Sequence, residues 1–323
     1  MTLQAPRVYI TRRLPEAGLA PLRAAGLDVV MRPRSSPVPR AELLAAVAGV
    51  AAVVSLLSDR IDGELLDAAG PSLEVVANYA VGHDNIDLDQ CRRRGVTVTN
   101  TPDVLTAATA DHAFALLLAT ARRLREGDEL VRSGTWTGWE PLQLLGRQVS
   151  GAVLGIVGMG RIGASVAARA RGFGMQVLYH NRHRAPEAER ATGGRLVSLE
   201  ELLRSSDFVS LHCPLTKGTR HLIDADRLAL MKPTAVLVNT ARGAIVDESA
   251  LVGALSSGAL WGAGLDVFEH EPELTPGLRE LPNVVLAPHT GSATEVARDG
   301  MARLCAEAVV TVLGGRVPPN VVT

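Results

Sequence analysis

The stretch VLGIVGMGRIGASVAARARGFG, residues 153–174, decides the fold of this chain. It opens with a short apolar run, continues with three glycines spaced as GxGxxG, and ends in a run with helical periodicity that Gly174 closes. A strand that enters a glycine-rich turn and then a helix is the first unit of a doubly wound parallel sheet. We therefore expect an α/β fold in which this stretch begins a parallel sheet.

The three glycines of this turn, Gly158, Gly160 and Gly163, also predict a binding function. The first permits a tight turn, the second lets the backbone approach a pyrophosphate, and the third lets helix and strand pack closely. The helix that begins at Arg161 and Ile162 offers free N–H groups and the positive end of its dipole to phosphates. A purely structural turn is the alternative, but the flanking strand and helix favour a dinucleotide site.

The end of the next expected strand bears on which dinucleotide binds. An NAD site normally presents an acid to the ribose there, about twenty residues after the glycines. This chain has His180, Asn181, Arg182, His183 and Arg184 instead, without a carboxylate. Arg182 or Arg184 could make charge-assisted hydrogen bonds to a 2′-phosphate, which an acid would repel. We therefore predict that NADP(H) is preferred and that NAD(H) is the alternative, with a solvated basic turn as the purely structural explanation.

Strands and helices alternate over the rest of the chain as well. Short β-branched runs at 7–11, 27–31, 51–57, 73–77 and 96–99 enclose helical runs at 15–25, 41–48 and 62–69. A long apolar helix at about 104–124 follows Pro102, and six more strands are expected at 153–157, 176–179, 208–212, 235–239, 262–267 and 284–287. Helical connections between strands imply right-handed crossovers and parallel sheets.

This order predicts two doubly wound parallel-sheet domains with a cleft between them. We expect a flavodoxin-like substrate domain at 1–101 plus 292–323, because the helix after Thr294 has no new strand to feed and could return to the first sheet. Residues 102–291 are expected to form a Rossmann domain for the dinucleotide. A length of 323 residues suits two cores of ordinary size.

Charge and cysteine content exclude several classes of function. The chain has 33 Lys and Arg against 34 Asp and Glu, and a formal charge of -1 gives no general attraction for nucleic acid or anionic lipid. Cys91, Cys213 and Cys305 are odd in number and lack CxxC spacing, which argues against a disulfide framework and structural zinc. No signal-peptide pattern is evident, and the longest apolar stretch, 43–57, is too short to span a bilayer. We therefore expect a cytoplasmic protein without a metal and without membrane or nucleic-acid partners.

Three segments in the second half place titratable groups beside strand ends, where open α/β sheets bind ligands. They contain Arg242, Asp266 with Glu271, and His289. Hydride transfer to a 2-oxo acid needs a cation for the carboxylate, a proton donor for the developing alkoxide and a group that keeps the donor charged. Arginine binds carboxylates bidentately, and a carboxylate beside a histidine raises the histidine pKa and selects its tautomer. Spacing alone does not exclude the seven other histidines, which are His83, His112, His180, His183, His212, His221 and His270.

Four separated motifs, taken together, resemble the D-isomer-specific 2-hydroxyacid dehydrogenase family over nearly the whole chain. They are the glycine-rich turn at 158–163, NTARGAIVD at 239–247, GLDVFEHEP at 264–272 and PHTGSA at 288–293. The resemblance implies that Arg242 binds the substrate, His289 is the acid/base and Glu271 is its carboxylate partner. It also implies cofactor contacts, with Asp266 beside the nicotinamide carboxamide and further contacts at Pro214, Thr219, Thr240 and Gly291.

Within this family, VGHDNID at 81–87, TPDVLT at 101–106 and GTWTGWEP at 134–141 resemble the glyoxylate and hydroxypyruvate reductase branch. The likeness implies that the backbone of Val81 and Gly82 holds the substrate carboxylate. It also implies that Leu57, Ser58 and Ser292 lie in or beside the substrate pocket.

The same branch carries a tryptophan, similar to Trp139, that reaches into the active site of the neighbouring subunit. Packing at a dimer contact is the structural alternative, and either interpretation favours a homodimer. The implied reaction is NADPH-dependent reduction of glyoxylate or hydroxypyruvate to glycolate or D-glycerate. Phosphoglycerate, D-lactate, formate and phosphite dehydrogenases resemble the same scaffold and stay open as alternatives. A nucleotide-sensing binding protein similar to the C-terminal-binding-protein corepressors is a further alternative.

Overall fold

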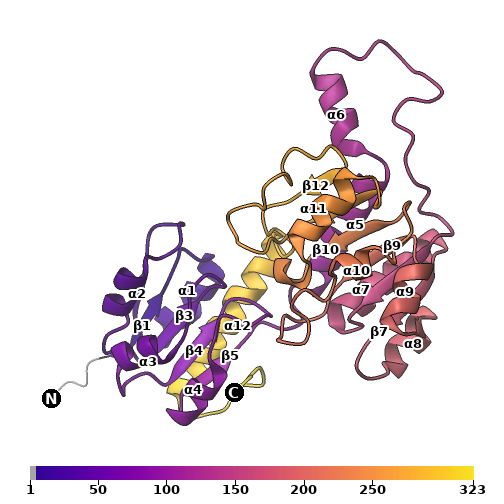
Figure 1. Ribbon diagram of the computed structural model, residues 1–323. Coiled ribbons are helices and arrows are strands. Elements are labelled where there is room, and N and C mark those ends of the chain that lie inside the picture. The colour runs from indigo at the N-terminus through magenta and orange to yellow at the C-terminus, as the bar shows by residue number, and fades with distance from the viewer. Residues whose placement is uncertain (1–4) are drawn as a thin grey trace. The chain divides into compact units, whose positions relative to one another are not determined.

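The computed structural model describes residues 5–323, which form two compact units, each built on its own parallel sheet (Figure 1). The first unit runs through Leu105 and resumes at Ala293, and the second comprises Thr106–Ser292. The predicted α/β class with two doubly wound parallel sheets is confirmed.

The first unit has a five-stranded sheet in the order β2-β1-β3-β4-β5, which is the order of flavodoxin-like folds. Its strands are β1 (Arg7–Ile10), β2 (Asp28–Met31), β3 (Ala52–Ser55), β4 (Val75–Asn78) and β5 (Thr97–Thr99). Its helices are α1 (Glu16–Ala24), α2 (Arg40–Ala46), α3 (Gly63–Ala69), α4 (Leu88–Arg93) and α12 (Glu295–Leu313). The sequence pattern does not predict α4, because its six residues cover fewer than two helical turns.

The C-terminal helix α12 packs within this first unit. Gly18 of α1 faces it so closely that a Cβ at Gly18 would lie 2.8 Å from the Cβ of Ala302. Tyr79, which follows β4, donates a hydrogen bond to the carbonyl oxygen of Arg298 at 2.7 Å. Burial raises the pKa of Tyr79 to about 12, which keeps this donor protonated. α12 is therefore tied both to a helix of the unit and to the carboxyl end of an inner strand.

The second unit has a seven-stranded parallel sheet in the order β12-β11-β10-β9-β6-β7-β8. Its strands are β6 (Val153–Val157), β7 (Gln176–His180), β8 (Arg195–Leu196), β9 (Phe208–Leu211), β10 (Val236–Asn239), β11 (Gly262–Leu265) and β12 (Val284–Leu286). The direction of winding reverses between β6 and β9, where Rossmann-type sheets bind a dinucleotide. All six predicted strands are present. The prediction missed β8, because two exposed residues at a sheet edge have no hydrophobic period.

The helices of the second unit are α5 (Thr106–Ala121), α6 (Leu124–Arg132), α7 (Arg161–Ala170), α8 (Pro186–Thr192), α9 (Leu199–Ser205), α10 (Ala225–Leu228) and α11 (Glu248–Ser256), with 3-10 turns η1 (Arg171–Phe173) and η2 (Gly243–Ile245). The single helix predicted at about 104–124 is wrong at its end. α5 stops at Ala121, and Arg123 adopts a left-handed conformation, with φ of 53°, before α6 begins. A left-handed residue cannot continue a right-handed helix.

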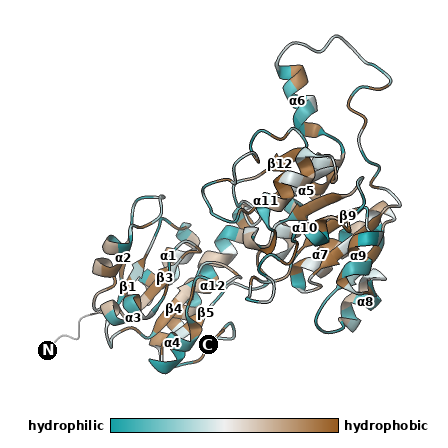
Figure 2. Ribbon diagram, viewed as in Figure 1, coloured by the Kyte–Doolittle hydropathy of each residue, from teal (hydrophilic) through white to brown (hydrophobic). Residues whose placement is uncertain are grey.

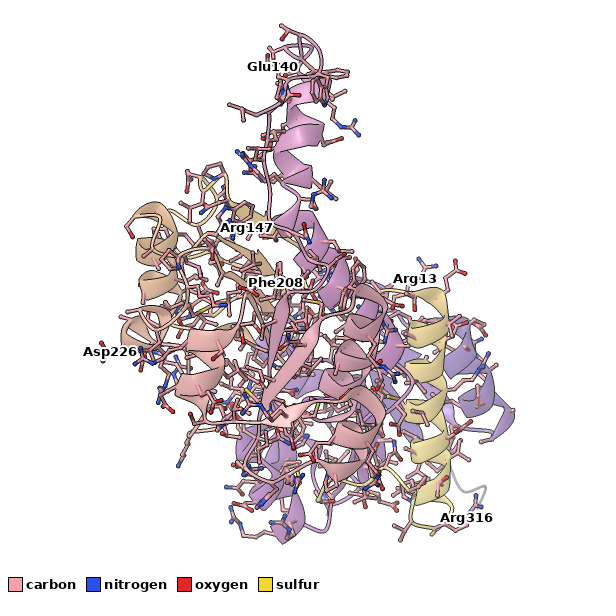
Figure 3. All side chains as sticks on the ribbon, turned by 90° about the vertical axis from the view of Figure 1, so that its right-hand side faces the viewer. Arg13, Glu140, Arg147, Phe208, Asp226 and Arg316 are labelled. Atoms are coloured by element: carbon pink, nitrogen blue, oxygen red, sulfur yellow. The ribbon has the colours of Figure 1, made fainter. Side chains whose placement is uncertain are left out.

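Residues 124–146, which comprise α6 and the loop behind it, project from the sheet of the second unit, and we call them the arm. Glu140 lies near its far end and Arg147 at its base (Figures 1 and 3). No residue of α6 is buried. Trp139 and Leu142 are 81% and 79% exposed. Large apolar side chains gathered on one exposed segment are typical of an interaction surface.

The cores of both units are built from aliphatic strand residues. The strands appear mostly hydrophobic in Figure 2, and β3, β4, β9, β10 and β11 are buried at every position. Parallel strands covered by helices on both faces require such continuous apolar runs. Only 3% of the residues are aromatic, so Ala, Val, Ile and Leu fill most of this space. No helix within residues 5–323 is both long and apolar enough to cross a bilayer.

Candidate active site

The glycine-rich turn between β6 and α7 is tightly packed at Gly158 and Gly163 and open at Gly160. Gly158 has a φ of 101°, and a Cβ there would lie 2.5 Å from the backbone nitrogen of Cys213. A Cβ at Gly163 would lie 2.1 Å from the carbonyl oxygen of Gly158, so the helix and the strand end are in contact. A Cβ at Gly160 would meet nothing within 4 Å, and Gly160 caps α7 without a side chain. The backbone at Gly160 is therefore open to a pyrophosphate beside the N–H groups of α7.

Of the residues after β7, one contacts the glycine-rich turn and another forms a local ion pair. Asn181 accepts a hydrogen bond from the backbone N–H of Met159 at 3.0 Å, and it thereby holds the turn. Arg184 pairs with Glu189 at 2.8 Å, and the hydrogen bond from Arg184 lowers the pKa of Glu189. Arg182 is exposed and forms no ion pair with any residue between 5 and 323. Of the two predicted arginines, Arg182 is therefore the more available cation.

The remaining predicted cofactor residues lie on neighbouring loops of the second unit. Arg161 and Ile162 are the first two residues of α7. After β9, the hydroxyl of Thr219 donates to the carbonyl oxygen of Pro214 at 2.7 Å and closes that loop. After β10, the hydroxyl of Thr240 is buried and has no hydrogen-bond partner in the part of the chain that the structure describes. A buried hydroxyl without a partner is costly unless a ligand completes it, so Thr240 fits the predicted cofactor site.

The turn after β10 carries Arg242 and is shaped by the buried side chain of Asn239. Asn239 donates from Nδ2 to the carbonyl oxygen of Arg242 at 2.8 Å and accepts from the N–H two residues ahead of it at 3.0 Å. The next residue, Gly243, lies against the backbone after β11. A Cβ on Gly243 would come within 1.9 Å of the carbonyl carbon of Phe268. This contact couples the turn of Arg242 to the loop after β11.

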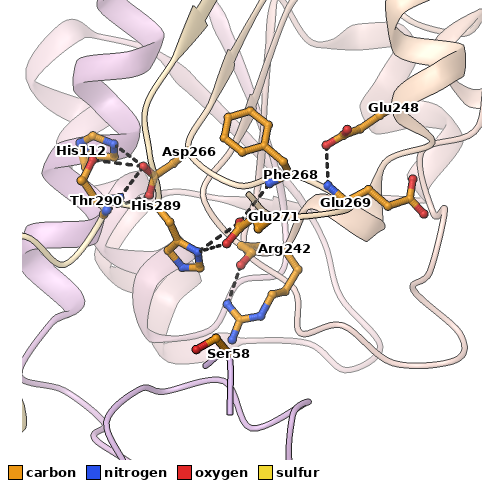
Figure 4. Close-up of polar contacts among 12 residues, drawn as sticks. Ser58, His112, Arg242, Glu248, Asp266, Phe268, Glu269, Glu271, His289 and Thr290 are labelled. Atoms are coloured by element: carbon orange, nitrogen blue, oxygen red, sulfur yellow. Dashed lines mark hydrogen bonds and ion pairs between the residues drawn. The ribbon is translucent and has the colours of Figure 1, made fainter. Parts of the chain in front are cut away.

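Glu271 and His289 form the hydrogen-bonded pair that acid/base chemistry needs (Figure 4). Nδ1 of His289 lies 2.9 Å and 3.1 Å from the two carboxylate oxygens of Glu271. Glu271 also accepts the N–H of Phe268 at 3.1 Å. Nε2 of His289 has no partner within residues 5–323, and the two side chains are 31% and 37% exposed, so a substrate can reach this nitrogen. Ser292 follows on the same loop as the last residue of the unit.

Asp266, directly after β11, holds the backbone that carries His289. Its carboxylate is 1% exposed and accepts the N–H groups of Thr290 and Gly291 at 2.7 Å each. His112 of α5 adds a hydrogen bond at 3.1 Å. His289 has a φ of 55°, an uncommon conformation for a residue other than glycine, and its N–H donates to the carbonyl oxygen of Asp266 at 2.8 Å. These contacts assign Asp266 a positioning role that the sequence pattern does not reveal.

Other histidines of the second unit are committed to different contacts. Nδ1 of His180 lies 3.1 Å from a backbone carbonyl oxygen, and burial lowers the pKa of His212 to about 4. His221 faces a carboxylate too, at 2.7 Å from Glu269, but Arg220 shares that carboxylate and Glu269 is only 10% exposed. No group of three or more His, Cys, Asp or Glu side chains within residues 5–323 could hold a metal ion. His289 is therefore the histidine best placed for proton transfer.

In the first unit, the loop after β4 presents two adjacent backbone amides. The carbonyl of Gly82 accepts from Nδ2 of Asn78 at 2.7 Å, and that of Val81 accepts from Nδ2 of Asn100 at 2.9 Å. The N–H groups of Val81 and Gly82 donate to no acceptor in the described residues. Adjacent amides without acceptors favour an anion such as a carboxylate. The sequence pattern does not reveal the roles of Asn78 and Asn100, because a single asparagine carries no periodic signal.

The loop after β3, also in the first unit, places Leu57 and Ser58 above a buried carboxylate. Asp59 is 2% exposed and accepts a hydrogen bond from the hydroxyl of Thr11 and one from a loop amide at 2.8 Å. Arg12 donates a hydrogen bond to the hydroxyl of Ser58. The loops after β1 and β3 therefore meet at the point where the strand order of this sheet reverses, which is where such sheets bind ligands.

Comparison with known proteins identifies the family of this chain. Residues 114–291 match the family model described as D-isomer specific 2-hydroxyacid dehydrogenase, NAD binding domain. A glyoxylate reductase from Thermococcus kodakarensis is 55% identical over 321 residues, which cover 98% of this chain and 96% of that protein. A glyoxylate reductase from Pyrococcus furiosus is 52% identical, over 98% of this chain and 95% of that protein.

Solved structures agree as well. A protein from Thermus thermophilus is 50% identical and matches with a TM-score of 0.92, over 98% of this chain and 100% of that one. An NADPH-dependent glyoxylate/hydroxypyruvate reductase from Sinorhizobium meliloti, in complex with NADP and malonate, is 34% identical with a TM-score of 0.86, over 99% of this chain and 97% of that one. The predicted enzyme class, an NAD(P)-dependent oxidoreductase, is confirmed. The chain belongs to the D-isomer specific 2-hydroxyacid dehydrogenase family.

Proposed function

We propose that this protein reduces glyoxylate to glycolate and hydroxypyruvate to D-glycerate, with NADPH as the preferred hydride donor. The observation that carries the proposal is the pair of Glu271 and His289, in which the carboxylate engages Nδ1 and leaves Nε2 for a substrate. Relatives that are glyoxylate reductases, at 55% and 52% identity, support the choice of substrate.

Three side chains of the second unit share the proposed chemistry. The guanidinium of Arg242 binds the substrate carboxylate, because its fork of N–H donors matches the two oxygens. A bound nicotinamide dinucleotide supplies the hydride that reaches the carbonyl carbon. His289 gives a proton from Nε2 to the carbonyl oxygen, and Glu271 holds the ring in the tautomer and orientation that this transfer requires.

The two units are proposed to bind different ligands. The free amides of Val81 and Gly82 support the first unit as the source of ligands for the substrate carboxylate, with Leu57 and Ser58 nearby in that unit. The open glycine-rich turn and the unpartnered hydroxyl of Thr240 support the second unit as the cofactor site.

The preference for NADPH rests on the end of β7. Asn181 stands where an NAD site normally has an acid, and Arg182 is exposed beside it. The Sinorhizobium meliloti reductase, which is NADPH-dependent, supports the same preference. Arg182→Asp should therefore lower kcat/KM for NADPH more than for NADH. Arg184→Ala is the control, because Arg184 is already paired with Glu189. An unchanged ratio of NADPH to NADH efficiency in Arg182→Asp would refute this account.

His289→Ala tests the proposed chemistry. It should lower kcat with glyoxylate by about a hundred- to ten-thousand-fold, which is the usual contribution of a positioned acid/base. The Kd for NADPH, followed by the fluorescence of the bound cofactor, should change little. Unaltered turnover in this variant would refute the role of His289. Absence of turnover in the unmodified protein with glyoxylate, hydroxypyruvate and a panel of other 2-oxo acids would refute the proposed function.

We also propose that the protein is a cytoplasmic homodimer. The exposed apolar side chains of the arm, Trp139 and Leu142 among them, support association with a second copy. All three cysteines are free, which suits a reducing compartment. Analytical ultracentrifugation should give a dimer. Trp139→Ala should distinguish a role of Trp139 in the partner's active site from packing at the dimer contact. Lower kcat in an intact dimer would indicate that Trp139 reaches the partner's substrate, whereas dissociation would indicate packing alone.

A further inference from the structure

We propose that Glu248, a buried carboxylate outside the candidate active site, is a positioning residue for Glu271. The inference rests on the proposed acid/base role of Glu271 and His289. Glu248 is the first residue of α11 and is only 2% exposed. No Lys, Arg or His in the described part of the chain forms an ion pair with it. A buried charge without a counterion is costly, so its presence calls for a function.

Glu248 bridges the two ends of the loop that carries Glu271. Its Oε1 accepts the N–H of Glu269 at 2.7 Å (Figure 4). Its Oε2 accepts the hydroxyl of Thr275 at 2.6 Å. Glu269 lies two residues before Glu271 in the sequence, and Thr275 lies four residues after it. One side chain anchored in a helix therefore restrains the backbone on both sides of Glu271.

The helix that carries Glu248 stabilises its charge. α11 begins after Asp247, whose side chain accepts the N–H of Ala250, and the positive end of the helix dipole lies in this first turn. Both oxygens of Glu248 therefore remain strong acceptors without a cation beside them. The ionised carboxylate can accept a hydrogen bond at each oxygen, which is what the two anchors require.

A shift of this loop would change the contact between Glu271 and Nδ1 of His289, which is now 2.9 Å. Displacements of about 1 Å in a catalytic group can cost roughly a hundredfold in rate. The contact of Gly243 with the backbone of Phe268 restrains the same loop, so the loss of Glu248 should be partial. We expect Glu248→Ala to lower kcat by about ten- to a hundredfold, with little change in KM.

The test is a double-mutant cycle in which Glu248→Ala is made alone and in combination with Glu271→Gln. The kcat for glyoxylate with NADPH is measured in all four proteins. If Glu248 acts through Glu271, its removal costs tenfold or more in the unmodified protein but less than about twofold in the Glu271→Gln background. Equal losses in both backgrounds would overturn the inference and leave the proposed function intact. Unaltered kcat in Glu271→Gln and His289→Ala would overturn the proposed function instead.

Three further variants distinguish positioning from general destabilisation. Glu248→Gln should restore most of the activity, because its carbonyl oxygen can accept from Glu269 and its amide can donate to Thr275. Thr275→Val removes one anchor at nearly constant shape, and its smaller loss of kcat should also disappear in the Glu271→Gln background. This variant keeps the inference testable if Glu248→Ala does not fold, and an equal loss in both backgrounds would count against it. Asp224→Ala removes the capping carboxylate of α10, which within residues 5–323 accepts hydrogen bonds only from Arg227, and should leave kcat unchanged.

Discussion

Gly243→Ala adds one methyl group where the turn of Arg242 meets the loop after β11. The new Cβ would lie 1.9 Å from the carbonyl carbon of Phe268 and 2.3 Å from the nitrogen of Glu269. Both atoms belong to the backbone, so no flexible side chain can give way. The segments must separate by about 1.5 Å to reach an ordinary contact of 3.4 Å. Overpacking of this kind costs about 1–3 kcal/mol of stability, and a shift of about 1 Å in a catalytic group costs roughly a hundredfold in rate.

The assay is NADPH oxidation with glyoxylate, together with thermal unfolding of the same preparation. We expect kcat to fall about a hundredfold and Tm to fall, while the Kd for NADPH changes little. Gly253→Ala is the matched control, because Gly253 is an exposed residue of α11 whose added Cβ would meet nothing within 4 Å. It should stabilise the protein by about 0.5–1 kcal/mol and leave kcat unchanged. Unaltered kcat and Tm in Gly243→Ala would refute the reasoning.

Three other predictions concern stability. Asp266→Asn leaves one acceptor oxygen, whereas two oxygens now hold the backbone after β12. Urea unfolding should therefore show a loss of about 1–3 kcal/mol in the free energy of unfolding. An unchanged midpoint would contradict the positioning role of Asp266. Burial raises the pKa of Asp207, but hydrogen bonds from Lys232 and a backbone N–H outweigh it and lower the pKa. The resulting stability is present above the pKa of the unfolded chain and is lost as the pH falls through the lower folded value. In Asp207→Asn, the free energy of unfolding should therefore fall less steeply as the pH is lowered below about pH 4. An unchanged slope would contradict this prediction. Gly18→Leu should lower the Tm, because it overpacks α1 against α12 at a cost of about 1–3 kcal/mol. An unshifted transition in calorimetry would contradict this prediction.

Most of the fold could be predicted because its signals are local. Buried strands appear in the sequence as short apolar runs, and Gly174 ends a helical period, so both can be recognised without tertiary contacts. The errors occurred where the local signal is weak. β8 has two exposed residues, α4 has six residues, and the break at Arg123 depends on a left-handed conformation that arginine adopts only in a suitable context.

The candidate site divides in the same way. Local motifs were sufficient to predict a parallel α/β fold, a glycine-rich turn open to a dinucleotide, and an arginine, a carboxylate and a histidine at strand ends. Spacing in the sequence could not select a candidate acid/base among eight histidines. Pairing with a carboxylate alone does not select one either, because His221 with Glu269 is as close a pair as His289 with Glu271. The resemblance to a family predicts His289. The tertiary structure supports that prediction, since the pair of His289 and Glu271 is partly exposed, while Glu269 is shared with Arg220 and nearly buried.

Only the tertiary structure identified the residues that hold these groups in place. Asn239, Glu248 and Asp266 each bind backbone amides or carbonyls of a functional loop, and two of them do so across more than twenty residues of sequence. Such partners become neighbours only because β10, β11 and β12 lie side by side, so that their carboxyl ends share one edge of the sheet. The hydrophobic pattern of the sequence predicts where each strand lies in the chain. The pairing of the strands decides which side chains meet at their ends.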